Sequence, residues 1–202
     1  IRDWQYCIVG SEMCIRDSSE AQRAAIAADP NWNDGYYSDD APPEKGLAAA
    51  RMMAVCTYRS WDSFEQRFAR ERRADGLYQV QSYLRHQGEK INQRFDANTY
   101  VTLTQAMHTH DLARGRGGYE EALRALSQPA LVVSVSSDTL YPPAEQRQLA
   151  EHLPNARYEI LDCPHGHDGF LIETETLGAM IADFREEGRA AGPLRAVSAG
   201  SE

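Results

Sequence analysis

The pattern of apolar residues divides the chain into two parts of different character. Between Ser19 and Leu126 the apolar residues recur at the spacing of α-helices, and in the segment 75–95 they fall three and four positions apart on one face. Further helices are predicted over 19–30, 44–60, 96–111 and 118–126. A proline ends the first of these segments and a proline pair precedes the second. The first part is therefore predicted to be helical throughout.

The pattern changes after residue 126. Residues 129–137, PALVVSVSS, are a continuous apolar run between turn residues, which is typical of a strand buried on both faces in a parallel sheet. We predict a helix over 142–154, a second strand over 156–163 and a terminal amphipathic helix over 170–188. This strand–helix–strand–helix order predicts the end of a doubly wound α/β fold.

These patterns divide the chain into four segments. Residues 1–18 lack periodicity, and their string SEMCIRDS resembles translated read-through, so we expect them to be non-native and disordered. Residues 19–126 are the helical region and residues 127–188 the α/β region. Residues 189–202 are rich in small side chains and are predicted to be a flexible tail.

Composition narrows the functional classes. With 42% hydrophobic and 25% charged residues and a net charge of -9, the chain is typical of cytoplasmic proteins, and the acidic balance argues against nucleic acid as a partner. No apolar run approaches the roughly 18 residues that a membrane helix requires. The four cysteines have no C-x-x-C spacing, so we expect neither a disulfide framework nor a zinc site.

Asp138 and His167 are the candidate catalytic pair. Each follows a predicted strand, and functional groups of open parallel sheets collect at the carboxyl ends of strands. A carboxylate beside a histidine fixes the imidazole tautomer and stabilises the imidazolium that forms when the ring takes a proton from a nucleophile. One known chain order for such relays is a serine in G-x-S-x-G, then the acid, then the histidine. The 202 residues contain the acid and the histidine but no G-x-S-x-G.

Other interpretations of the histidines are weaker. The motif H-x-H-D occurs at 108–111 and at 165–168, and paired histidines can hold a metal, but neither motif is followed by further ligands at metal-site spacing. His108 and His110 lie at a helix end, where a histidine cation is favourable. Cys163 is expected to be a packed residue of the second strand rather than a nucleophile. We therefore expect no metal.

Arg51 and Tyr58 are candidate ligand-binding residues. They lie on one face of an alanine-rich helix, and an arginine that lines a cleft is costly unless it meets an anion. That anion is either a substrate carboxylate or an acidic residue of the chain in an internal salt bridge. The residues alone leave both alternatives open.

Three segments together resemble one family. GLAAARMMAVCTYRS, SYLRHQGEKINQRFDANTYVTLTQAM and LVVSVSSDTLYPPAEQRQLAEHLPNARYEILDCPHGHDGFLIE are similar, in order and spacing, to the second half of the homoserine O-acetyltransferases of the α/β-hydrolase superfamily. The resemblance runs from about residue 19 to residue 187 and implies a hydrolase-type core with a helical lid, formed by residues 19–126, inserted before the last two strands. The nucleophile-bearing half is missing, so we expect this chain to be inactive alone and to expose the interfaces of that half.

The resemblance also implies residue roles. Asp138 corresponds to the triad acid and His167 to the general base, Asp168 to the residue that holds the substrate amine, Arg51 to the carboxylate clamp and Tyr58 to a lid tyrosine. An acetyl group would pass from acetyl-CoA to a serine and then to the hydroxyl of L-homoserine, in methionine biosynthesis, without a bound cofactor. A homodimer joined through lid helices is also implied. Alternatives are a succinyl donor, a serine acceptor, a non-catalytic amino-acid-binding relative, and an esterase.

Overall fold

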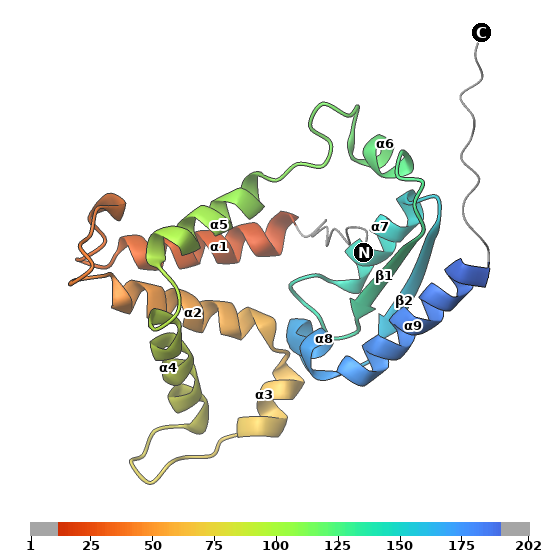
Figure 1. The fold of residues 1–202 in the computed structure, drawn as a ribbon. Helices are drawn as coiled ribbons and strands as arrows, with labels where there is room; N and C mark the ends of the chain where they lie inside the picture. The colour runs from red at the N-terminus through yellow and green to blue at the C-terminus, as the bar shows by residue number, and fades with distance from the viewer. Residues whose placement is uncertain (1–11, 191–202) are drawn as a thin grey trace.

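The computed structural model describes residues 12–190, which form helices followed by a small parallel sheet with flanking helices (Figure 1). The helical region contains α1 Glu12–Ala27, η1 Asn33–Gly35, α2 Glu44–Tyr58, α3 Trp61–Phe68, α4 Gln79–Asn92, α5 Ala97–Thr109 and α6 Tyr119–Arg124. The α/β region contains β1 Ala130–Val135, α7 Pro143–His152, β2 Ala156–Leu161, η2 Gly166–Asp168, α8 Gly169–Ile172 and α9 Thr174–Ala190.

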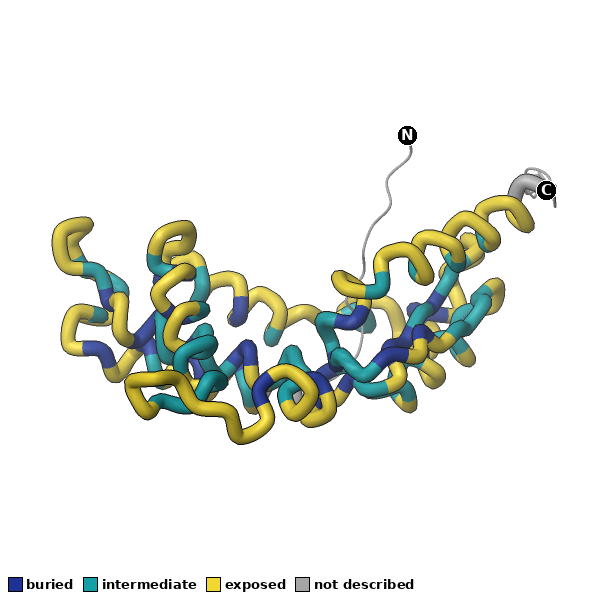
Figure 2. The backbone as a smooth tube through the Cα atoms, turned by 90° about the horizontal axis from the view of Figure 1, so that it is seen from below, coloured by how far each residue is buried: buried dark blue, intermediate teal, exposed yellow. Residues whose placement is uncertain are grey.

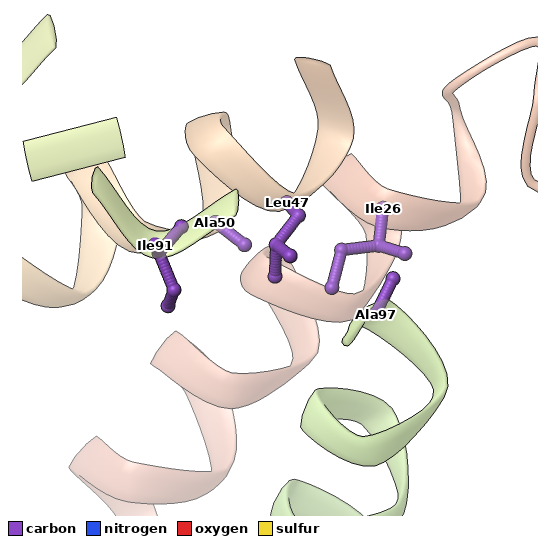
Figure 3. Packing of buried hydrophobic residues seen from close by; sticks show 5 residues of the cluster. All are labelled: Ile26, Leu47, Ala50, Ile91 and Ala97. Atoms are coloured by element: carbon purple, nitrogen blue, oxygen red, sulfur yellow. The ribbon is translucent and has the colours of Figure 1, made fainter. Parts of the chain in front are cut away.

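The helical region has its own apolar core. Figure 3 shows the buried side chains where α1, α2, α4 and the start of α5 meet, namely Ile26, Leu47, Ala50, Ile91 and Ala97. A β-carbon at Gly46 would lie 2.8 Å from the backbone oxygen of Ala25, so glycine is needed where α1 and α2 touch. Ala50 and Ala54 of α2 are fully buried, so the alanines of this segment serve close helix packing as well as helix propensity.

The α/β region confirms the predicted fold class. The strands β1 and β2 pair in parallel, from Ala130 opposite Ala156 to Val135 opposite Leu161, and α7 forms the connection between them. One small apolar cluster lies between the sheet and α7 (Leu123, Val132 and Leu149), and another lies at the carboxyl ends of the strands (Val135, Leu161 and Cys163). The second cluster underlies the turns that carry the candidate catalytic residues.

The sheet is less covered than its sequence predicts. In β1, Leu131 and Val133 are only half-buried, although the apolar run favours burial on both faces, and Ile160 of β2 is 43% exposed. Further apolar side chains lie exposed on α8 and α9 (Phe170, Leu171, Ile172 and Ile181), and Figure 2 shows α9 as largely exposed. Within residues 12–190, β1 and β2 pair only with each other. Exposed apolar faces of this kind are typical of interaction surfaces.

Several segments differ from the sequence-based prediction. The helix α1 begins at Glu12, so residues 12–18, which were expected to be disordered, are helical, whereas residues 1–11 and 191–202 lie outside the described residues. Residues between α3 and α4 are not helical, because an isolated antiparallel bridge joins Arg72 to Tyr78. None of the described helices has both the length and the apolar character needed to cross a membrane.

Candidate active site

Asp138 is a buried carboxylate held by the turn after β1. Its side chain is 4% exposed, and its Oδ1 accepts hydrogen bonds from the backbone N–H groups of Leu140 (2.8 Å) and Tyr141 (2.9 Å). Aspartate side chains commonly bond to backbone groups two and three residues ahead, which explains why this turn forms here. The two bonds leave Oδ2 to face the turn after β2.

His167 meets that carboxylate. Its Nδ1 lies 2.8 Å from Oδ2 of Asp138, although the two residues belong to turns after different strands. The ring stacks on Tyr141, with centroids 4.9 Å apart, and contacts Phe170 at 5.4 Å and Tyr58 at 5.8 Å. A neutral imidazole that donates its Nδ1 proton to a carboxylate keeps Nε2 as an acceptor. This arrangement can take a proton from a hydroxyl group and return it.

The turn that carries His167 requires glycine at two positions. Gly166 has a φ of +69°, and a β-carbon there would lie 2.6 Å from the backbone nitrogen of Ser60, at the corner between α2 and α3. At Gly169 a β-carbon would lie 2.4 Å from Sγ of the buried Cys163. Cys163 therefore packs beneath the turn, and burial raises the pKa of its thiol, which is unsuited to a nucleophile.

Ser137 joins the two turns directly. Its hydroxyl donates to the backbone oxygen of Cys163 (2.7 Å) and accepts from the backbone N–H of Gly166 (2.9 Å). The neighbouring Ser136 accepts from the N–H of Cys163 at 3.1 Å. These cross-links hold the turn of Asp138 and the turn of His167 in one relative position. Sequence reasoning missed this role, because a serine in a turn has many local partners and nothing in the pattern specifies a distant one.

The helix α2 brings Arg51 and Tyr58 to the same site. The Arg51 guanidinium lies over the Tyr58 ring, 5.5 Å from its centroid, and Arg51 Nε is buried without a hydrogen-bond partner in the described part of the chain. Burial raises the pKa of Tyr58, while the charge of Arg51 lowers it and that of Asp168 raises it. Both charges therefore lie near the Tyr58 phenol. For Tyr100 on α5, burial is again the main cause that raises the pKa, to about 12.

Asp168 has an ionic partner that sequence reasoning missed. Its Oδ2 lies 3.1 Å from Nε of Arg59, the residue that follows α2, and the two side chains are 26% and 15% exposed. In contrast, Arg51 forms no ion pair with any acidic residue in the described part of the chain. The alternative that its anion is an acidic residue of the chain would require such a pair. The sequence feature that could have indicated a role for Arg59 at this site is its position next to Tyr58.

The other histidines take no part in this cluster. His108 lies 3.1 Å from the Arg23 side chain, on the α1–α5 face, whereas His165 lies 3.4 Å from the hydroxyl of Ser63 on α3. Among the described residues, no group of three or more histidine, cysteine, aspartate or glutamate side chains is arranged to hold a metal ion. The structure thus brings together Asp138, His167, Asp168, Arg51 and Tyr58, and it leaves His108 and His110 apart.

Comparison with proteins of known sequence points to one group of enzymes. The chain is 55% identical to a homoserine O-acetyltransferase of Chlorobaculum tepidum over 177 residues, which are 88% of this chain and 49% of the relative. The chain therefore spans about half the length of the curated relatives it matches, and this half is the C-terminal portion.

Solved structures and a family comparison agree on the fold. A homoserine O-acetyltransferase from Bacillus anthracis superposes with a TM-score of 0.76 at 20% identity, covering 85% of this chain and 48% of that one. The esterase E22 superposes with a TM-score of 0.74 at 21% identity, covering 83% of this chain and 49% of that one. Residues 15–173 match the family model described as alpha/beta hydrolase fold. The chain belongs to the α/β-hydrolase fold family.

Proposed function

We propose that this chain is the lid and the acid–histidine end of an O-acyltransferase that moves an acetyl group from acetyl-CoA to the hydroxyl of L-homoserine, in methionine biosynthesis. The observation that carries the proposal is the buried Asp138 bonded to His167 at 2.8 Å, with the Tyr58 ring 5.8 Å from the His167 ring and the Arg51 guanidinium over Tyr58. The 55% identity to a homoserine O-acetyltransferase supports the same activity.

The proposed chemistry is a ping-pong reaction. A serine outside this chain attacks the thioester carbonyl of acetyl-CoA while Nε2 of His167 takes its proton; the C–S bond breaks, and the proton passes to the leaving thiolate. The homoserine hydroxyl then attacks the acyl-serine, His167 takes the hydroxyl proton, and that proton returns to the serine oxygen. Asp138 stabilises the imidazolium in both steps. Acetyl-CoA is a substrate here, and the proposal includes no bound cofactor or metal.

The charged residues explain why the acceptor would be an amino acid. L-homoserine carries an ammonium and a carboxylate, so its recognition needs one acid and one base at a fixed separation. Arg51 presents a planar guanidinium for the carboxylate, and its Nε has no other hydrogen-bond partner in the described residues. Asp168 supplies the carboxylate for the ammonium, and the Tyr58 phenol lies near both charges. A neutral ester would use neither charge, which favours transfer over the esterase alternative.

The donor and the acceptor retain alternatives within the family. Succinyl-CoA as donor, or L-serine as acceptor, would use the same acid–histidine pair. A non-catalytic amino-acid-binding relative would keep Arg51 and Asp168 but form no acyl-enzyme. We further propose a cytoplasmic homodimer joined through the lid helices.

The test requires a nucleophile, because the 202 residues contain no G-x-S-x-G. We define the hybrid enzyme as the Chlorobaculum tepidum relative in which residues 19–188 of this chain replace the matching C-terminal portion. Two rates are measured: release of p-nitrophenol from p-nitrophenyl acetate, which reports acyl-enzyme formation, and acetylation of L-homoserine by acetyl-CoA. Circular dichroism verifies that each variant is folded.

The expected result is that the hybrid forms the acyl-enzyme and acetylates homoserine. Arg51→Ala should remove homoserine turnover while acyl-enzyme formation persists, and His167→Ala should remove both. A folded hybrid that forms the acyl-enzyme but only hydrolyses it would refute the transferase proposal in favour of an esterase. A folded hybrid that forms no acyl-enzyme would favour the non-catalytic alternative. Unchanged homoserine turnover in Arg51→Ala would refute the carboxylate clamp.

A further inference from the structure

Arg59 lies where the helical region meets the histidine turn, and nothing in the proposed chemistry uses it. Its Nε lies 3.1 Å from Oδ2 of Asp168, and one terminal nitrogen lies 3.4 Å from the hydroxyl of Ser63. The Arg59 side chain is 15% exposed, less than the 26% of Asp168. An arginine that ends a helix in extended conformation would ordinarily reach solvent, so its inward position calls for a cause.

The backbone around Arg59 is seated firmly against the histidine turn. Ser60 donates its hydroxyl to the backbone oxygen of Pro164, and the same hydroxyl accepts from the N–H of Ser63 at 3.0 Å, which caps α3. Gly166 lies so close to this corner that a β-carbon would lie 2.9 Å from the carbonyl carbon of Arg59. The position of the Arg59 side chain relative to Asp168 is therefore set by backbone contacts on both sides.

We propose that Arg59 is a positioning residue for the amino-acid acceptor, which acts by holding Oδ2 of Asp168 so that Oδ1 faces the substrate ammonium. The inference rests on the proposed function, in which Asp168 binds that ammonium. It gives the two arginines different roles, because Arg51 meets the substrate carboxylate, whereas Arg59 meets a carboxylate of the protein.

The physical reason is preorganisation. The terminal torsion of an aspartate is broad, so a half-buried carboxylate without a partner samples many orientations. A charge-assisted bond from a less exposed guanidinium restricts that torsion before substrate arrives, which lowers the entropy cost of binding. Arg59 also balances the charge of Asp168 while the acceptor site is empty, when an unpaired and half-buried carboxylate would be costly.

The test compares Arg59→Gln and Arg59→Lys in the hybrid enzyme, each with Asp168 intact and with Asp168→Asn. Arg67→Gln is the matched control, because Arg67 is an exposed arginine of the neighbouring helix α3 that contacts the rings of Phe68 and Tyr83. The readouts are KM and kcat for L-homoserine and the rate of acyl-enzyme formation. Circular dichroism is again measured for each variant.

We expect Arg59→Gln to raise the homoserine KM about tenfold, equivalent to about 1.4 kcal/mol, with a much smaller change in acyl-enzyme formation. Arg59→Lys should recover part of this loss, and Arg67→Gln should match the parent. Because Arg59 acts through Asp168, its substitution should change KM less than about twofold in the Asp168→Asn background.

Three results would overturn the inference. An unchanged KM for L-homoserine in Arg59→Gln would show that Asp168 does not need Arg59 to fix its orientation. An equal effect of Arg59→Gln with and without Asp168 would show that Arg59 binds substrate directly or only supports the fold. A parallel fall in acyl-enzyme formation would likewise indicate a structural role. A parent hybrid that is folded but does not acetylate homoserine would refute the proposed function and this inference together, whereas the three results above leave the proposed function standing.

Discussion

The change Gly166→Ala tests whether the corner between α2 and α3 determines the position of His167, the candidate catalytic histidine. Gly166 directly precedes His167 and has a φ of +69°, a conformation that residues with a β-carbon rarely adopt. A β-carbon there would lie 2.6 Å from the nitrogen of Ser60 and 3.0 Å from the oxygen of Tyr58. Both atoms belong to the backbone, so a side-chain rotation cannot relieve the contact.

Two costs add in this substitution. Placing alanine in the left-handed region costs about 1–2 kcal/mol. Forcing a methyl group against fixed backbone atoms costs about 1–3 kcal/mol, as in overpacked cores. If the turn moves to relieve the contact, the backbone N–H of Gly166 also leaves the hydroxyl of Ser137, which now accepts it at 2.9 Å. We therefore expect the free energy of unfolding to fall by about 2–5 kcal/mol.

The matched control is Gly178→Ala in α9, because a β-carbon at Gly178 meets no atom within 4 Å. Alanine in a helix is favoured over glycine by about 0.8–1 kcal/mol, so this change should stabilise slightly. Urea unfolding of the hybrid enzyme, followed by circular dichroism, measures both changes. Acyl-enzyme formation should fall in Gly166→Ala alone, because His167 shifts relative to Asp138. A loss below about 0.5 kcal/mol in Gly166→Ala, within the range of ordinary surface substitutions, would refute the argument.

Three further predictions use the same hybrid enzyme. Asp138→Asn should slow acyl-enzyme formation by roughly 10³-fold or more, because the amide cannot stabilise the imidazolium, and a fall below tenfold would contradict the pairing. Ser137→Ala should lower the free energy of unfolding by about 1–3 kcal/mol, because it leaves the Gly166 N–H unpaired and the Cys163 oxygen with only the longer bond from the Ser136 hydroxyl at 3.3 Å; the exposed neighbour Thr139→Ala is the control, and equal effects would contradict the cross-link. Tyr100 keeps its proton to a pKa of about 12 in the folded state, against an ordinary 10.0, so its contribution to stability is complete below pH 10 and is lost as the pH rises toward 12. Absorbance titration of the parent minus Tyr100→Phe should show a phenol with a midpoint near 12, and a midpoint near 10 would contradict this burial.

The two strands and the acid–histidine pair could be predicted from sequence because each rests on a local signal. An apolar run bounded by turn residues specifies β1, and the parallel order of β1 and β2 places Asp138 and His167 at the same edge. The two residues meet at 2.8 Å, as expected of turns at that edge. The role of each residue in catalysis stays a prediction until the variants are measured.

The contacts between the helical region and the turn could not be predicted in the same way. Arg59 pairs with Asp168, and Gly166 packs against the backbone of Ser60. Both contacts join positions more than 100 residues apart, as does the hydrogen bond between Ser60 and Pro164, which are 104 residues apart. No periodicity specifies such contacts, because they depend on where α2 ends relative to the sheet. The short helix α3 was not predicted as a separate helix, although Ser60, which caps it, is a residue type that commonly begins a helix.

The helical region and the α/β region contribute different residues to the candidate site, and this difference suggests how one fold serves both esterases and acyltransferases. The acid and the histidine come from the turns after β1 and β2, whereas Arg51, Tyr58 and Arg59 come from α2 and its end. The esterase E22 shares the fold at a TM-score of 0.74, so the fold alone does not decide whether water or an alcohol attacks the acyl group. Within the proposed function, that choice depends on how long an acceptor stays beside the acyl-serine, and the charges at the end of α2 determine this residence. Substitutions there are expected to change the ratio of transfer to hydrolysis at a constant rate of acyl-enzyme formation, whereas substitutions at Asp138 should lower both products together.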